Sequence, residues 1–205
     1  MSKIENLERR NYAFPVTVTG EEDKRSVEGY ALLFDTPSDG LSFSEVIERG
    51  ALDGVIAKSN VFALLDHDES RGILARSKYG EGTLTLTVDD RGLKYRFDAP
   101  RTALGDELLE YLRRGEITES SFAFTVEKET WEYQDDDTWK RTIHQIDRLF
   151  DVSPVFDAAY SATSVCMRGK EQAEAELEVQ KRKAEEEAKA EIEEYYSKKY
   201  QSINF

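Results

Sequence analysis

The sequence predicts a mainly β protein of the α+β class, with a compact, mostly antiparallel, barrel-like core and a charged helix towards its C-terminal end. Three observations support this fold class. Residues 83–88 (TLTLTV) alternate in hydrophobicity with a period of two, which is typical of a strand. Apolar residues of the segment 102–115 fall on one helical face. Residues 170–199 are nearly all Glu, Lys, Ala, Gln and Arg, a composition that favours a long solvated helix.

The composition indicates one folded domain with an appendage. A chain of 205 residues is long enough for a domain of ordinary size. Hydrophobic residues make up 39% of the chain and charged residues 34%, but the excess of charge is concentrated near the C-terminal end. We therefore expect a folded domain at 1–168 and a charged helical tail at 169–205.

The first elements are strands. Residues 12–19 and 26–34 are predicted to pair around a turn at 20–23, and Gly29 inside the second run indicates a bulge or a close backbone approach. Residues 45–52 are expected to form a short helical or irregular crossing.

A second group of strands surrounds the alternating segment. The uninterrupted apolar run 60–65 favours a strand covered on both faces. The turn signal at 89–92 separates residues 83–88 from a further alternating run, 93–97, and so predicts a hairpin.

The pattern then changes to a helix and back. In 102–115 the apolar face ends with two arginines and Gly115, which is the expected end of a helix. Strands are predicted at 121–127 and 138–153, and a short apolar run at 162–167 is expected to close the sheet. The helix at 170–199 carries only a narrow, alanine-rich apolar stripe, which does not specify a partner.

Charge and cysteine content exclude several function classes. The formal net charge of −14 opposes binding to nucleic acid or to an anionic membrane, whereas attraction to a basic partner or substrate segment is physically reasonable. Cys166 is the only cysteine, so no intrachain disulfide forms and a reducing compartment is expected. No signal-peptide core and no run of about 18 apolar residues is present, so we expect a soluble, cytoplasmic protein.

His67 is the first residue that could carry chemistry. It lies between Asp66 and Asp68, directly after the apolar run 60–65, where side chains leave the core and can line a cleft. A lone histidine, without other catalytic residues beside it in the sequence, is more often structural than catalytic. The neighbouring acidic residues do not make a convincing metal site, because adjacent residues of an extended chain point in opposite directions.

Ser121 is the second candidate. Strand alternation in 120–124 (SSFAF) sends Ser121 and Ala123 to one face and both phenylalanines to the other. The small-residue face leaves room for a substrate chain, and the phenylalanines fix the strand from behind. A serine at the start of a strand is about as often a capping residue as a nucleophile.

A serine nucleophile and a histidine base require a third group that orients the imidazole. The candidates lie in 143–153, where Asp147 and Asp151 share one face of an unbroken strand and His144 lies on the other. The chain order His, Ser, acid differs from the orders found in the familiar serine proteases.

The succession of short motifs resembles the prohead maturation proteases of tailed phages, which are related in fold to the herpesvirus assemblins. The resemblance covers about residues 25–168 and consists of the motifs at 28–31 (EGYA), 48–51 (ERGA), 64–68 (LLDHD), 82–84 (GTL), 90–93 (DRGL), 115–117 (GEI), 120–124 (SSFAF), 149–156 (LFDVSPVF) and 158–163 (AAYSAT).

This resemblance implies a catalytic assignment. His67 matches the general base, Ser121 the nucleophile and Asp151 the acidic position of a Leu-x-Glu-Val-Ser-like motif, where Asp is one methylene shorter than the usual Glu. Ser120 stands where the family pattern has Met and is therefore a second candidate nucleophile. Because assemblins use a second histidine as the third member, His144 is an alternative to Asp151. Asp147 is a further alternative, ranked after His144.

The resemblance also implies the partners. Such a serine endopeptidase, which needs no cofactor or metal, cuts scaffold protein or a scaffolding extension of the major capsid protein, and often itself, inside the assembling procapsid in the host cytoplasm. Contact with the portal or procapsid interior and self-association are expected, and neither nucleic acid nor membrane is. The tail becomes a docking or scaffold-like segment. The alternative is a catalytically silent β-barrel structural protein of the phage particle, and a weaker one is an acidic scaffolding protein.

Overall fold

The computed structural model describes residues 6–12, 15–19, 25–38, 41–156 and 164–201, with side chains described as far as residue 194. The chain divides into two compact units, Met1–Cys166 and Met167–Phe205. The first contains both β-sheets and the second contains most of one long helix. The roles expected of the folded domain (1–168) and of the charged tail (169–205) stay predictions.

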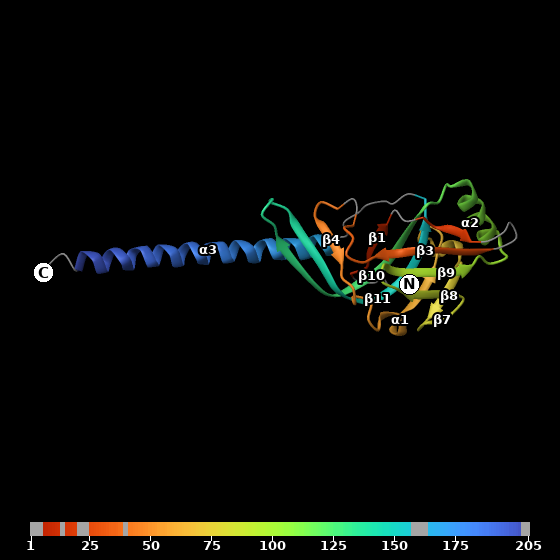
Figure 1. Cartoon of the computed structure of the whole chain (residues 1–205), viewed down its shortest axis with the longest axis horizontal. Coiled ribbons are helices and arrows are strands. Elements are labelled where there is room, and N and C mark those ends of the chain that lie inside the picture. Colours follow the sequence, from red (N-terminus) through yellow and green to blue (C-terminus); the bar gives the residue numbers. More distant parts are fainter. Residues whose placement is uncertain (1–5, 13–14, 20–24, 39–40, 157–163, 202–205) are drawn as a thin grey trace. The chain divides into compact units, whose positions relative to one another are not determined.

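The first unit consists of two open sheets with short helices (Figure 1). Strand content is 43% and helix content 28%, which confirms the α+β class, although the sheets do not close into a barrel. The larger sheet has the order β1-β10-β11-β5-β6-β7, with β4 also paired to β11, and the smaller has the order β2-β3-β9-β8. The larger sheet contains β1 (Glu8–Tyr12), β4 (Ser44–Ile47), β5 (Asn60–Ala63), β6 (Ala75–Lys78), β7 (Glu81–Gly82), β10 (Glu119–Tyr133) and β11 (Trp139–Val155). The smaller contains β2 (Thr17–Thr19), β3 (Ser26–Leu33), β8 (Leu84–Val88) and β9 (Gly92–Asp98).

The predicted hairpin and the predicted helix are confirmed. β8 and β9 pair antiparallel around the turn at 89–92. Helix α2 (Ala103–Arg114) begins after Thr102, whose Oγ1 accepts a hydrogen bond from the backbone N–H of Gly105. It ends at Gly115, which has a φ of 70° and therefore adopts the left-handed conformation that suits glycine.

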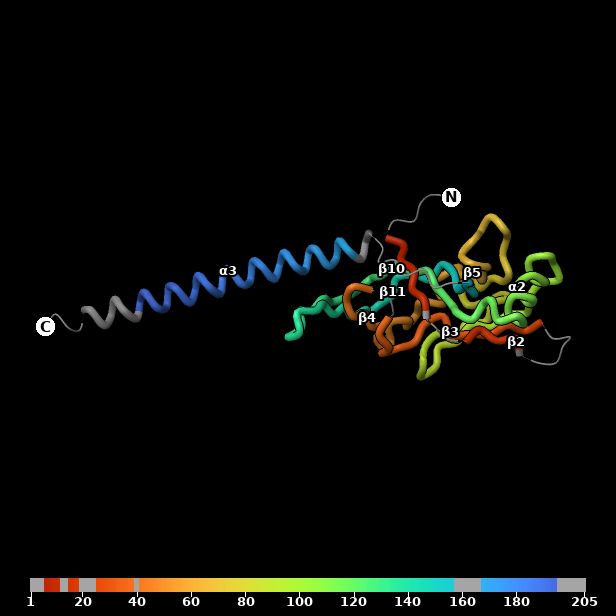
Figure 2. Tube along the Cα trace, turned by 90° about the horizontal axis from the view of Figure 1, so that it is seen from above, coloured from red at the N-terminus to blue at the C-terminus, as the bar shows by residue number. Residues whose placement is uncertain are grey.

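The strands β10 and β11 form the longest hairpin of the described chain, and its tip extends away from the rest of the first unit (Figures 1 and 2). Near the tip, Trp131 packs edge-on against Phe43 and Trp139. At the base, Phe122 and Phe124 point into the shared core between the sheets together with Tyr95. The base of this hairpin is the part that carries Ser121 and Asp151.

The expected single strand at 12–19 is wrong in part. β1 ends at Tyr12 and pairs with β10, whereas β2 begins at Thr17 and pairs with β3 in the other sheet. Pro15 lies between them and has no N–H to donate to a ladder, which favours a break there. Residues 13–14 and the turn expected at 20–23 lie outside the described residues.

The helical or irregular crossing expected at 45–52 is also wrong in part. β4 pairs parallel with β11 from Lys140↔Ser44 to Ile143↔Ile47 before the chain turns into α1 (Val55–Lys58). A strand whose partner is about a hundred residues distant leaves no local turn signal in the sequence. β6 and β7, which follow the short 3₁₀ turn η1 (Glu69–Arg71), were missed for another reason: they are short and mostly polar.

The expected closing strand at 162–167 is helical from Ser164 onwards, and residues 162–163 lie outside the described residues. The predicted C-terminal helix therefore begins earlier, as α3 (Ser164–Gln201). Extending a helix adds one hydrogen bond for each residue fixed, so a strong helix-forming segment readily recruits a short apolar run at its start.

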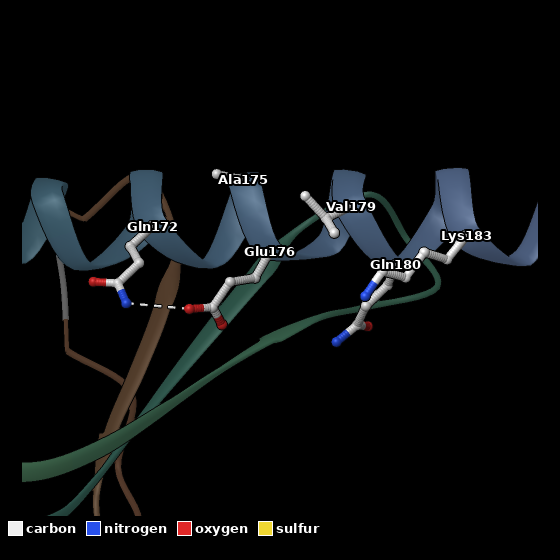
Figure 3. A pocket seen from close by; sticks show the side chains of 6 residues that line it. All are labelled: Gln172, Ala175, Glu176, Val179, Gln180 and Lys183. Carbon is white, nitrogen blue, oxygen red and sulfur yellow. Dashed lines mark hydrogen bonds between the residues drawn. The ribbon is translucent and has the colours of Figure 1, made fainter.

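Helix α3 bears one shallow groove on its surface, drawn in Figure 3. Its lining residues all belong to α3 and are Gln172, Ala175, Glu176, Val179, Gln180 and Lys183. Gln172 Nε2 donates to Glu176 Oε1 at 3.1 Å, so part of this polar lining is satisfied within the helix (Figure 3). Among the described helices, none is long and apolar enough to cross a membrane.

Candidate active site

The base of strand β10 has two faces with different surroundings. Ser121 is paired with Asn11 of β1 on one side and with Ser153 of β11 on the other. From Glu119 to Ala123 the pairing with β11 runs without a bulge, so alternation is regular there. Ser121 and Ala123 accordingly share a face, whereas Phe122 and Phe124 stack on each other in the core, as the sequence predicts.

A tight turn after β5 delivers the histidine. Leu64 and Leu65 are buried, and Asp66 and His67 follow with φ values of 55° and 58°. Positive φ in two successive non-glycine residues is uncommon, although Asp and His tolerate it better than most residue types. The N–H of Asp66 donates to the carbonyl of Pro154 in β11 at 3.0 Å, which ties this turn to the strand that carries Asp151.

The structure brings the three predicted residues into one hydrogen-bonded chain. His67 Nε2 lies 2.6 Å from Ser121 Oγ, and His67 Nδ1 lies 2.5 Å from Asp151 Oδ1. The side chains of His67 and Asp151 are 12% and 8% exposed, and Ser121 has no exposed surface. The contact between the ring and Asp151 shows that the shorter aspartate reaches the imidazole.

Asp151 has a second hydrogen-bond donor. Ser153 Oγ, which is buried, donates to the same Oδ1 atom at 2.7 Å. Two donors on one carboxylate oxygen fix its orientation. The carboxylate of Asp151 accepts a hydrogen bond from the proton on His67 Nδ1 and leaves Nε2 free to accept the proton of the serine. Ser153 was missed because a serine in a strand carries no separate signal in the sequence.

Ser121 also contacts the N-terminal strand. Its Oγ lies 3.1 Å from the main-chain carbonyl oxygen of Arg10 in β1 and donates to it. A hydroxyl has a single proton, so it donates either to this carbonyl or to His67 Nε2. When His67 is protonated, its Nε2–H donates to the serine oxygen and the hydroxyl proton is directed to Arg10. β1 thus belongs to the hydrogen-bonded surroundings of the nucleophile.

A cluster of five charged residues, four of them buried and one partly exposed, holds β1 in place. Arg10 Nε and Nη2 donate to both carboxylate oxygens of Glu45, at 2.6 and 2.7 Å. Arg141 Nη1 and Nη2 donate to Glu8 at 2.7 and 2.8 Å, and Arg141 Nη1 also reaches Glu45. Glu129 completes the cluster through Arg141 Nε. These hydrogen bonds join β1 to β4 and β11.

Electrostatics in this cluster are dominated by the arginines. Burial alone would raise the pKa of Glu45, but the hydrogen bonds from Arg10 and the positive charges of Arg10 and Arg141 outweigh burial. The pKa of Glu45 therefore lies below its usual value, and the residue is ionised at neutral pH. The sequence shows these residues only as ordinary charged positions, because they come together from four separate strands, β1, β4, β10 and β11.

Ser120, the second candidate nucleophile, faces the other sheet. Its Oγ is hydrogen-bonded to the hydroxyl of Tyr95 at 2.8 Å, and both residues are buried. Burial raises the pKa of Tyr95, more than the bond to Ser120 lowers it, so the phenol stays protonated. Gly29 is required beside this pair, because a Cβ there would lie 2.8 Å from the tyrosine oxygen. The groups that approach Gly29 closely are thus side chains, whereas the sequence predicted a close backbone approach.

The two other candidates for the third member have other partners. His144 Nδ1 lies 2.7 Å from Glu48 Oε2, and its Nε2 lies 2.9 Å from Thr130 Oγ1. Asp147 accepts a hydrogen bond from Thr125 and pairs with Lys58. A bulge in β11 just before Asp151 interrupts the regular alternation on which the predicted common face of Asp147 and Asp151 depended.

A buried hydroxyl, an imidazole and a carboxylate in one hydrogen-bonded chain are the arrangement found in serine hydrolases. A family model described as caudovirus prohead serine protease matches residues 14–196. The chain therefore belongs to the caudovirus prohead serine protease family, a family of capsid maturation proteases.

Comparison with solved structures gives a weaker likeness. The capsid assembly protease gp21 of bacteriophage T4 matches with a TM-score of 0.44 and 10% sequence identity, over 74% of this chain and 98% of that one. A comparison with curated proteins gives no match.

Proposed function

We propose that this chain is a serine endopeptidase that cleaves scaffold protein, or the scaffolding extension of the major capsid protein, and also itself, during procapsid maturation. The hydrogen-bonded chain from Ser121 through His67 to Asp151 carries this proposal. Membership of the prohead protease family supports procapsid maturation as the process in which the chain acts.

The geometry supports acyl transfer. His67 Nε2 takes the proton of Ser121 while Oγ attacks the scissile carbonyl carbon, and Asp151 stabilises the resulting imidazolium through Nδ1–H. The imidazolium then gives its proton to the leaving amine as the peptide C–N bond breaks. Water, deprotonated by His67, hydrolyses the acyl-enzyme, which releases the new carboxyl end and restores Ser121.

Substrate access requires a rearrangement. Ser121 has no exposed surface in this structure, so a peptide reaches its hydroxyl only after the groups that cover it move.

Processing of the capsid protein tests the function. The chain is co-expressed with its capsid protein, and wild type is compared with Ser121→Ala and Ser120→Ala. We expect Ser121→Ala to abolish processing and Ser120→Ala to retain it. Identical processing in wild type and Ser121→Ala contradicts the nucleophile assignment and favours the structural alternative. Loss in Ser120→Ala alone, with full activity in Ser121→Ala, moves the nucleophile by one residue.

The tail is proposed to be a docking or scaffold-like segment that self-cleavage removes. Its described side chains from 181 to 194 are all exposed along α3, which supports a solvated helix available to a partner. A chain truncated at Lys170 is expected to enter proheads less than the full chain does. Packaging at the full level eliminates this role.

A further inference from the structure

One carboxylate oxygen near the nucleophile, Oε2 of Glu119, has no hydrogen-bond partner among the residues that the structure describes. Glu119 is the first residue of β10, and it is half-buried. Its Oε2 atom is shielded from solvent and accepts no hydrogen bond from any of the described residues. Shielded carboxylate oxygens are normally satisfied, because an ionised oxygen without a donor or counter-charge loses its hydration without compensation.

The register places Glu119 on the nucleophile's face of β10. The pairs Glu119↔Val155, Ser121↔Ser153 and Ala123↔Asp151 follow each other without a bulge. Residues two apart in a strand share a face and are separated by about 6.7 Å along it. Ser120, between them, faces Tyr95 in the opposite sheet, which confirms the alternation at this point. Glu119 therefore lies beside the Ser121–His67–Asp151 chain and away from the core.

We propose that Glu119 determines substrate specificity by pairing with a lysine or arginine side chain of the substrate close to the scissile bond. This inference rests on the proposed function. An extended substrate advances about 3.3 Å per residue, so a carboxylate two residues along β10 from Ser121 reads a side chain within about three residues of the bond that is cut. The incoming cation supplies the missing donor, and the pair gains strength because it is partly shielded from water.

The charge of the chain favours a basic partner. The formal net charge is −14, so a basic substrate segment is attracted towards the protein before it binds. An acidic side chain at this position would face Glu119 at close range and would be excluded. The same group thus selects for a cation and against an anion.

Cleavage-site profiling tests the proposal. The full-length chain is incubated with peptides made by glutamate-specific digestion of a bacterial lysate, which retain internal lysine and arginine, and new ends are identified by mass spectrometry. Wild type is expected to show lysine and arginine enriched at one position within three residues of the cut. Glu119→Gln is expected to reduce that enrichment roughly tenfold, and Glu119→Lys to replace it with enrichment of acidic residues.

Glu116→Gln is the matched control. Glu116 lies in the turn before β10, is exposed and pairs with Arg114, so its loss leaves the cleavage profile unchanged. A wild-type profile without basic preference, or one that Glu119→Gln retains, overturns the specificity role. Equal cutting by wild type and Ser121→Ala instead overturns the proposed function.

If the purified chain does not cut peptides, a binding measurement tests the proposal instead. Full-length Ser121→Ala is titrated with two fluorescent peptides that differ only in having lysine or norleucine residues. Tighter binding of the lysine peptide that Glu119→Gln abolishes supports the proposal, and equal binding of both peptides contradicts it. Thermal unfolding of each variant checks that the substituted chains remain folded.

Discussion

The two histidines of this chain have similar partners but very different surroundings. His67 contacts Ser121 and Asp151 at 2.6 and 2.5 Å, and His144 contacts Thr130 and Glu48 at 2.9 and 2.7 Å. Each is thus a hydroxyl–imidazole–carboxylate chain. Around His67 the carboxylate is 8% exposed, whereas Glu48 is 47% exposed and Thr130 lies at the surface.

This difference shows that distances alone do not define an active site. An exposed carboxylate and an exposed hydroxyl exchange their partners for water at little cost, so such a pair contributes on the order of 0–1 kcal/mol. Around His67 the shielding from water strengthens each interaction, and Ser153 fixes the carboxylate in addition. We expect chemistry at His67 and a surface contact at His144.

Removal of the two hydroxyls tests the comparison most strongly. Ser121→Ala is expected to lower the rate of capsid protein processing by up to about 10⁶-fold, because no nucleophile remains. Thr130→Ala is expected to leave it within about twofold. The initial rate of processing in co-expression, followed by mass spectrometry, gives both values. A large loss in Thr130→Ala would contradict the surface assignment of the His144 chain.

Replacement of the carboxylates of Asp151 and Glu48 should change the processing rate almost as unequally. Asp151→Asn keeps the shape of the side chain but no longer holds the imidazole in the required tautomer, so processing should slow by about 10⁴-fold. Glu48→Gln should have no measurable effect on the same rate. If Asp151→Asn processes at the normal rate, the third member of the site lies elsewhere.

The buried charge cluster extends the comparison from activity to stability. Arg141→Met leaves Glu8 and Glu45 with Arg10 alone and removes the arginine partner of Glu129, and should lower the free energy of unfolding by about 3–5 kcal/mol at pH 7. Arg49→Met removes an exposed pair with Asp35 and should cost less than about 1 kcal/mol. Urea unfolding measures both.

The pH dependence of the same variants gives an independent check. The pKa of Glu45 is lowered in the folded chain, so its stabilising contribution is present above its unfolded pKa of about 4.3 and is lost as the pH falls through the folded value. The penalty of Arg141→Met should therefore shrink in acid, because the carboxylate of Glu45 becomes protonated and no longer needs the arginine. A penalty independent of pH would show that Arg141 contributes by packing alone.

The smallest expected effect concerns the support of Asp151. Ser153→Ala removes one donor from its carboxylate and should reduce the processing rate roughly tenfold without loss of the fold. Ser70→Ala removes a comparable donor from the exposed carboxylate of Asp68 and should change nothing. Equal rates for wild type and Ser153→Ala would mean that the contact with His67 alone orients Asp151.

Local patterns predicted the elements whose partners are near in the sequence. The hairpin of β8 and β9 and the capped helix α2 follow from alternation, turn residues and the sequence around Thr102 and Gly115. Such signals depend on neighbours in the chain. β4 has its partner about a hundred residues away, and the strand expected at 12–19 divides between two sheets, so neither outcome was visible locally.

The candidate site shows the same division. Motifs identified His67, Ser121 and Asp151 as candidates, and their catalytic roles remain predictions. The sequence alone determined that a histidine and a serine follow or begin buried strands, because hydrophobic pattern and side-chain alternation are local properties. Only the tertiary structure decided that Ser120 faces Tyr95 while Ser121 faces His67, and that the carbonyl of Arg10 and the hydroxyl of Ser153 join the site. Apart from the contact of Ser153 with Asp151, which spans two residues and is local to β11, those contacts join residues 25 to 111 positions apart, and they exist only once packing has fixed the register.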